Sequence, residues 1–205
     1  MNRLTSGQRV KKYRQFAPLL KKWREIVEKY CKLEKGDAPY WYTERTLVGT
    51  LAAAAWQIPH YLSLEEYSVD KSKPLGRGKQ RWPGRADLWI RAGKNEYVFE
   101  AKHRFRNIGS RTRRPIDFST YCRDRLNKTK KGAKNINRKS GRALGLLFVA
   151  PRITITEKRN IDERINIFLK KLKEVDVDIA WVFPSDALNL RYEGRIYPGV
   201  VVLIG

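Results

Sequence analysis

Two short apolar runs separated by a glycine-containing turn constrain the fold of this chain more than any other feature. Residues 86–90 and 97–101 are rich in apolar and aromatic side chains, and Gly93 lies within the turn, residues 92–95. This pattern predicts an antiparallel β-hairpin whose register is set by the turn. In that register Asp87 lies directly across from Glu100, with the two Cβ atoms roughly 5 Å apart.

Three charged side chains gather on one face of the predicted hairpin. Glu100 and Lys102 are two residues apart and therefore share the face that Asp87 meets from the other strand. Two adjacent carboxylates repel each other unless a cation is bound or one pKa is raised. Carboxylate oxygens suit Mg²⁺, which also accepts waters and phosphate oxygens. With a lysine that can hold or deprotonate a water, the set fits metal-assisted phosphodiester hydrolysis.

A solvated ion pair is the alternative interpretation of these three residues. Such pairs are common on sheet surfaces and are worth less than about 1 kcal/mol. However, Glu100 lies between Phe99 and Ala101 in an apolar run that is typical of a central strand, where an unpaired charge is costly. The catalytic interpretation is therefore favoured.

Asp87 followed by Glu100-Ala101-Lys102 resembles the PD-(D/E)xK motif of restriction-endonuclease-like nucleases. The Glu-x-Lys half is intact, whereas Ala86 stands where the motif has proline. The resemblance covers about residues 40–150 and implies a restriction-endonuclease-like core. It also implies a DNA nuclease that depends on Mg²⁺, with Mn²⁺ able to substitute. Asp87 and Glu100 would be metal ligands, the Ala101 carbonyl a further ligand, and Lys102 the residue that positions the attacking water.

A glutamate near the start of a predicted helix is a further candidate. Residues 42–56 have helical apolar spacing, and Glu44 lies at the N-terminal edge of the apolar stripe. The resemblance implies a glutamate on the helix before the sheet that adds a ligand or orients water. The alternative is a carboxylate that the helix dipole favours in the first turn by about 0.3–1 kcal/mol.

The remaining periodicities predict an α/β fold, a mixed β-sheet flanked by helices. Helices are expected at residues 16–33, 42–56 and 156–175, with another starting near 115–117; strands are expected at 62–69, 86–90, 97–101, 143–150, 179–183 and 199–204. We expect one nuclease-like domain over residues 1–205, with an N-terminal helix at about 16–34 and a C-terminal helix-strand extension at about 156–205. Residues 1–15 are expected to form a loose arm.

The charge of the chain predicts a polyanionic partner. Lys and Arg number 44 against 21 Asp and Glu, a formal net charge of +23, which favours nucleic acid. Residues 71–84 contain glycines and prolines and are expected to form a mobile basic loop, and residues 103–142 carry the densest positive charge. The predicted nucleic-acid contacts are Lys73, Arg77, Lys79, Arg81, Arg104, Arg111, Arg113, Arg114, Lys128, Lys130 and Lys131.

Other features exclude several classes of protein. Two cysteines give neither a disulfide framework nor a zinc site. The N-terminal residues lack the apolar core of a signal peptide, no run approaches membrane-spanning length, and no basic amphipathic anchor indicates a membrane partner. We expect a cytoplasmic nuclease that acts on DNA as an endonuclease, and a homodimer would serve cleavage of both strands. The alternatives are a non-catalytic DNA-binding or packaging protein of the same fold, and an RNA-directed nuclease of a toxin or defence system.

Overall fold

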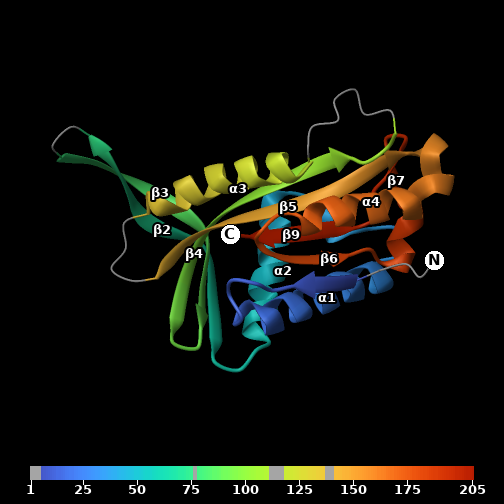
Figure 1. Cartoon of the computed structure of the whole chain (residues 1–205). Helices are drawn as coiled ribbons and strands as arrows, with labels where there is room; N and C mark the ends of the chain where they lie inside the picture. Colours follow the sequence, from blue (N-terminus) through green and yellow to red (C-terminus); the bar gives the residue numbers. More distant parts are fainter. Residues whose placement is uncertain (1–5, 76–77, 111–117, 137–140) are drawn as a thin grey trace.

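A large mixed β-sheet forms the centre of the protein (Figure 1). The computed structural model describes residues 6–75, 78–110, 118–136 and 141–205. Strands β4 and β5 are parallel, and the other neighbours in the sheet are antiparallel. The order across the sheet is β1 (Ser6–Arg9), β6 (Asp178–Val182), β9 (Val200–Ile204), β5 (Arg142–Thr154), β4 (Asn95–Asn107), β3 (Gly78–Ala92) and β2 (Tyr61–Leu75). The short strands β7 (Arg191–Tyr192) and β8 (Arg195–Ile196) pair with each other, and β8 also pairs with the end of β5.

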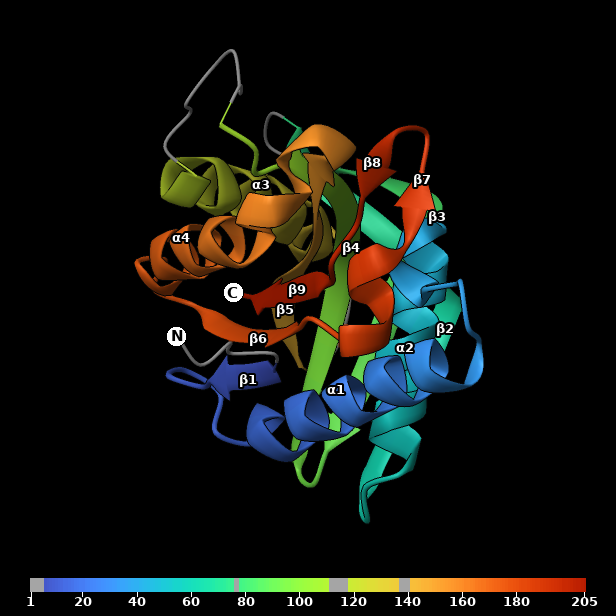
Figure 2. The same cartoon turned by 90° about the vertical axis from the view of Figure 1, so that its right-hand side faces the viewer.

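Helices cover both faces of this sheet. Helices α1 (Phe16–Leu33) and α2 (Glu44–Trp56) pack on one face, and α3 (Phe118–Lys134) and α4 (Ile161–Lys173) pack on the other (Figure 2). The central strand β5 supplies both cores, because Leu146 and Phe148 point to the first helix pair while Leu147 and Val149 point to the second. This explains its continuous apolar run. The predicted α/β fold, a mixed sheet flanked by helices, is confirmed.

The helix boundaries differ from the predictions in two places. The helix expected from residue 42 begins at Glu44, because Thr43 is extended and the 3₁₀ turn Pro39–Trp41 precedes it. The helix expected at 156–175 is divided into the 3₁₀ turn Ile155–Asn160 and α4. A third 3₁₀ turn, Ser185–Asn189, precedes β7. Within the described part of the chain, no helix has the length and apolar content needed to cross a bilayer.

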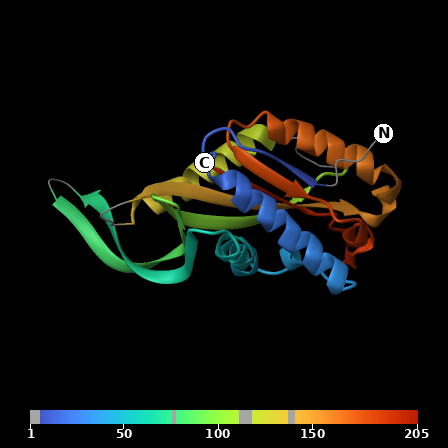
Figure 3. The same ribbon diagram turned by 90° about the horizontal axis from the view of Figure 1, so that it is seen from below.

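The prediction of a mobile loop at residues 71–84 is wrong. The described residues of this segment belong to β2 and β3, which pair from Tyr61↔Ala92 to Leu75↔Gly78. The outer ends of these two strands project away from the sheet as a two-stranded arm (Figure 3). The glycines and prolines of this segment are typical of a loop, which is why its composition predicts one. In a ribbon of two strands, a proline can occupy a position whose N–H would face outward, so Pro74 and Pro83 remove no necessary ladder bond.

The prediction of a loose arm at residues 1–15 is also wrong for the part that the structure describes. Ser6–Arg9 form β1, which pairs with β6. Beyond it, the fully buried carboxylate of Asp178 accepts the backbone N–H groups of Lys11, Lys12 and Tyr13 at 2.6, 2.8 and 2.9 Å. The polar composition of this segment does not predict its structure, because the residues that bind it lie more than 160 positions away in the sequence.

One bend in the β2–β3 hairpin positions the candidate site. The ladder between β2 and β3 is interrupted between the pairs Glu65↔Leu88 and Tyr67↔Ala86, and Glu66 there has φ +49°. Strand β3 pairs with β4 up to Leu88↔Phe99 and then turns away. As a result, no strand among the described residues pairs with the edge of β4 after Phe99 on that side, while its other edge stays paired with β5.

Candidate active site

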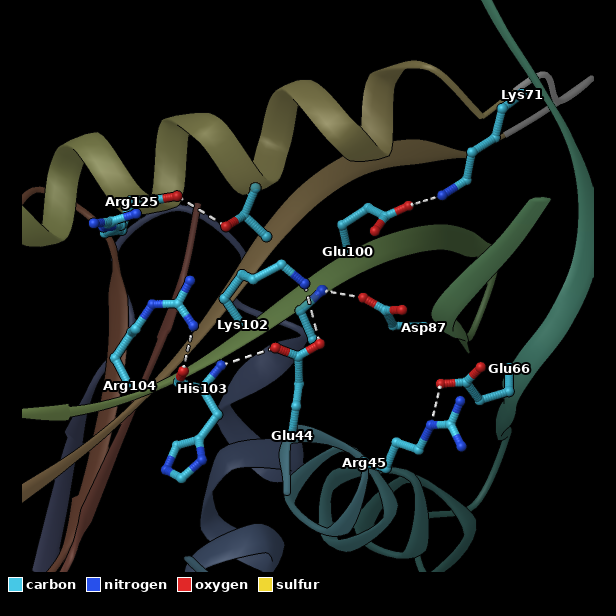
Figure 4. A network of polar contacts seen from close by, with 12 residues as sticks. Glu44, Arg45, Glu66, Lys71, Asp87, Glu100, Lys102, His103, Arg104 and Arg125 are labelled. Atoms are coloured by element: carbon cyan, nitrogen blue, oxygen red, sulfur yellow. Dashed lines mark hydrogen bonds and ion pairs between the residues drawn. The ribbon is translucent and has the colours of Figure 1, made fainter. Parts of the chain in front are cut away.

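Side chains take the place of the missing strand along the open edge of β4 (Figure 4). The Asp87 Oδ2 atom accepts the backbone N–H of Ala101 at 2.6 Å, and the Glu44 Oε2 atom accepts that of His103 at 2.9 Å. The Arg104 guanidinium donates to the His103 carbonyl at 2.8 Å. Backbone groups at a sheet edge need such partners when water is excluded. The bend therefore brings charged side chains from α2, β3 and β4 to one place.

Asp87 and Glu100 lie near each other at this edge, but the predicted pairing of the two residues across the strands is not formed. The ladder between β3 and β4 ends at Leu88↔Phe99, one pair short of them. Glu100 is 14% exposed, and its Oε1 atom accepts a hydrogen bond of 2.5 Å from the Lys71 ammonium, which is 18% exposed. Burial raises the pKa of Glu100; the hydrogen bond from Lys71 opposes this shift, and the negative charge of Asp87 adds to it.

Lys102 and Glu44 form a second ion pair beside the two carboxylates. The Lys102 Nζ atom donates to Glu44 Oε1 at 3.1 Å, and the side chains are 42% and 28% exposed. Glu44 is the first residue of α2, so the helix start lies against the open edge. Lys102 thus bonds Glu44 rather than Asp87 or Glu100, although its charge also lowers the pKa of Glu100 slightly.

A pocket of about 240 Å³ opens next to Glu100, between β4 and α3. Its β4 side chains are those that alternate onto one face, and its α3 side chains come from successive turns of the helix. A Cβ atom on Gly132 would lie 3.3 Å from the Glu100 Cγ atom, so the glycine lets the helix approach closely. One carboxylate and several cations line the pocket. Strand β4 contributes Glu100, Lys102 and Arg104, and α3 contributes Arg125, Lys128 and Gly132.

Several oxygen atoms at this edge are of the type that could hold a hard divalent ion. Each of Asp87 and Glu100 has one carboxylate oxygen that forms no hydrogen bond with another described residue. The carbonyl of Ala101 points to the same edge as its N–H, because both groups of a strand residue face the same neighbour. Magnesium completes such a set with waters and phosphate oxygens. Over residues 6–75, 78–110, 118–136 and 141–205, no group of three His, Cys, Asp or Glu is arranged for a metal, so protein carboxylates alone do not form a closed cage.

The predicted nucleic-acid contacts fall into separate groups. Those on the arm are exposed, two line the pocket, and one on α3 lies away from it. Lys73, Lys79 and Arg81 are on the arm, Arg104 and Lys128 line the pocket, and Lys131 is exposed on α3. Lys130 lines a second pocket with Lys12 on the other flank of α3, and burial, with the charges of Lys134 and Lys12, lowers its pKa. Arg77, Arg111, Arg113 and Arg114 lie outside the described residues.

Two residues of the site escaped the sequence interpretation. The sequence predicts Lys71 at the start of a loop, but its neighbour Ser72 donates its N–H to the carbonyl of Asn135 at 2.6 Å, which holds the Lys71 strand beside Glu100. Arg125, which the sequence does not mark as a candidate, lines the pocket. No local pattern marks Lys71, whereas the position of Arg125 three residues before Lys128 indicates that they share a helical face.

Comparisons with known proteins assign no family. The chain matches no protein-family model and no curated protein. A solved structure described as "Crystal structure of SSO0001" is similar over 65% of this chain and 60% of that one, with 13% sequence identity and a TM-score of 0.19. The chain thus spans less than two thirds of that structure, and the likeness is too weak to assign a fold or a function.

Proposed function

We propose that this protein is a Mg²⁺-dependent nuclease of the PD-(D/E)xK type, an endonuclease that hydrolyses phosphodiester bonds in DNA. The observation that carries the proposal is the open edge of β4, where Asp87, Glu100 and the Glu44–Lys102 pair lie beside a pocket whose other charged side chains are cationic. An anionic phosphate suits that pocket. The proposal is supported by the residue types at this edge, because such hydrolysis uses oxygen ligands for a metal, a group that holds the attacking water and cations near the phosphate.

Each residue has a role that follows from its contacts. Asp87, Glu100 and the Ala101 carbonyl would hold the ion, with Mn²⁺ able to replace Mg²⁺. When bound, the ion polarises the phosphate and lowers the pKa of a water. Lys102, oriented by Glu44, holds the attacking water in line with the phosphate.

The cations of the pocket complete the proposed mechanism. Three cations of the pocket bind the phosphate next to Glu100: Arg104, Arg125 and Lys128. Their positive charges offset the negative charge of the phosphate as the attacking oxygen approaches. Arg104 is itself fixed by its bond to the His103 carbonyl, so its guanidinium is placed before substrate binds. Such placement reduces the reorganisation needed at the moment of reaction.

The Lys71–Glu100 ion pair favours a second candidate, a DNA-binding protein without catalytic activity. A lysine that neutralises Glu100 can stabilise the fold without any metal. In that case, metal would add nothing to stability or to cleavage. The two candidates therefore differ in their response to divalent ions.

A plasmid-nicking assay tests the proposal. Supercoiled DNA should be nicked with Mg²⁺ or Mn²⁺ and left intact with EDTA, and Asp87→Asn, Glu100→Gln or Lys102→Ala should abolish nicking while DNA binding persists. Lys94→Ala, at the exposed turn of the same hairpin, is the matched control and should cleave normally. DNA binding without cleavage in any divalent ion would support the second candidate, and cleavage of RNA alone would reassign the substrate.

The site of action and the number of subunits follow from the same proposal. Cys31 and Cys122 are free and buried, which suits the reducing cytoplasm. One proposed site per chain cuts one strand, so double-strand cleavage calls for a homodimer. The mass of the complex on a short duplex would measure this.

A further inference from the structure

The arm formed by residues 71–75 and 78–82 extends beyond the body of the protein (Figures 1 and 3). Its two strands pair with each other from Lys71↔Trp82 to Leu75↔Gly78. At about 3.4 Å per residue, five residues reach roughly 17 Å. The Ser72 bond to Asn135 and a bridge between Lys71 and Ile136 anchor its base to the end of α3. The arm is therefore a two-stranded ribbon whose base is anchored to the residues that follow α3.

The charge of the arm is of one sign. Between Asp70 and Asp87 the sequence contains no acidic residue. Lys73, Lys79 and Arg81 are exposed and form no ion pair with another described residue. Like charges this close destabilise the free arm, so a polyanion is the partner that relieves them.

One face of the arm runs directly into the candidate active site. Residues paired across an antiparallel ribbon share a face, so Lys71 and Trp82 lie on the face of Lys73 and Gln80. At the inner end of this face Lys71 contacts Glu100. A polymer that followed the face would therefore reach the pocket.

We propose that this arm inserts into the major groove of duplex DNA. The groove, about 12 Å wide, admits a two-stranded ribbon, and Lys73 and Gln80 are of the types that bond guanine and adenine edges. Lys79 and Arg81, on the other face, have side chains long enough to reach the phosphates that line the groove. The inference deepens the proposed nuclease function, on which it rests, by making the substrate a helical duplex.

Other partners fit the arm less well. Single strands bind on exposed aromatic platforms, and in the described part of the arm Trp82 is the one aromatic residue and is partly buried. Addition of a strand from another protein is opposed by Pro74, Pro83 and the lysines, which are features that protect sheet edges from pairing. Charge and shape together favour duplex DNA.

Binding in EDTA tests the inference without cleavage. The variant Lys73→Ala/Lys79→Ala should weaken binding to a 20-base-pair duplex about tenfold. The slope of log affinity against log salt should fall by about 1, because Lys79 contacts a phosphate whereas Lys73 contacts a base edge. The control Lys29→Ala/Lys32→Ala removes two exposed lysines from α1, across the sheet from α3. It should change affinity less than twofold, and single-strand binding should be equal in both variants.

A duplex whose cytosines carry glucosylated hydroxymethyl groups identifies the groove. These groups fill the major groove, so wild-type affinity should drop to that of the arm variant, whose own affinity should stay constant. Gln80→Ala, which changes no charge, should reduce discrimination between duplexes of different sequence. Three results would each overturn the inference. The arm and α1 variants could lose the same duplex affinity, single-strand affinity could depend on the arm as strongly as duplex affinity does, or glucosylation could leave the duplex affinity of the wild type unchanged.

Cleavage data separate this inference from the proposed function. If wild-type protein cleaves no nucleic acid but the arm-dependent duplex binding is found, the nuclease proposal fails and the arm inference stands. If Mg²⁺-dependent cleavage is found and arm substitutions change neither affinity nor groove dependence, the arm inference fails alone.

Discussion

Replacing Lys71 with methionine should destabilise the protein in a way that depends on pH and on Mg²⁺. The substitution keeps the length of the side chain but removes the ammonium that bonds Glu100. Both partners are less than one fifth exposed, so solvent replaces the lost bond poorly. Hydrogen bonds to charged groups contribute about 1.5–3 kcal/mol, and we take about 2 kcal/mol. For a chain of this size this corresponds to a Tm about 4–8 °C lower at pH 7.

The pH dependence has a definite sign. Burial already raises the pKa of Glu100, and loss of Lys71 removes the main opposing effect. A carboxyl whose pKa is higher in the folded than in the unfolded state destabilises the fold when ionised. The stability of the variant should therefore fall as pH rises through the unfolded and then the folded pKa of Glu100. The Tm difference from wild type should shrink toward pH 4, where Glu100 is protonated.

Magnesium should replace the missing ammonium. An ion that binds the folded state with [Mg²⁺] at 100 times Kd adds about 2.7 kcal/mol of stability. Thermal unfolding of Lys71→Met with and without 10 mM Mg²⁺ should show recovery of the lost Tm, and Glu100→Gln in the same background should remove both the loss and the recovery. An equal Tm loss at pH 4 and pH 7, or no response to Mg²⁺, would refute this account of Glu100.

Three further substitutions test separate parts of the structure. Glu44→Gln keeps an acceptor for the His103 N–H but removes the charge that orients Lys102; single-turnover cleavage should slow about tenfold, with DNA affinity unchanged. Burial, with a smaller effect of the Arg104 charge, lowers the pKa of His103 to about 4. The free energy of unfolding should therefore fall as pH drops from about 6.5 to 4, because the unfolded state binds a proton that the folded state does not. Denaturant titrations of His103→Phe should lack this pH-dependent loss of stability. Asp178→Ala leaves three backbone N–H groups without their acceptor; it should cost about 3 kcal/mol or more, and hydrogen exchange should become fast in residues 6–13.

The sequence predicted those parts of the site that depend on neighbours along the chain. The turn at Gly93, where φ is +61°, sets the pair Ala92↔Asn95 and hence the register that brings Asp87 near Glu100. The apolar spacing of α1 and α2 likewise reflects which helix face is buried. In both cases the pattern of neighbouring residues agrees with the tertiary structure, so that pattern is enough to predict the turn and the buried helix faces.

Contacts between distant segments account for what the sequence did not predict. The bend of β3 away from β4, the docking of Ser72 on Asn135 and the pairing of β1 with β6 each need two segments to meet. A segment rich in Lys, Gly and Pro has the composition of a loop, yet pairing between its two halves makes it a ribbon. Lys71 consequently had no visible partner in the sequence, although it lies against the carboxylate that the motif identified.

The bend at Glu66 connects the candidate active site with the arm. A residue other than glycine in the left-handed region costs about 1–2 kcal/mol, and the ion pair of Glu66 with Arg45, which is 73% exposed, offsets little of this. The ladder register continues unchanged on both sides, so Glu66 would face Asp87 if the strands were straight. The strain therefore falls beside a proposed metal ligand, and strained backbone tends to be kept where function requires it.

A straight hairpin would let β3 cover the edge of β4, occupy the N–H groups that Asp87 and Glu44 now bind, and hold the arm against the sheet. The proposed cleavage site and the proposed duplex-binding arm thus lie on either side of the same distorted residue, so the two proposals share one structural feature.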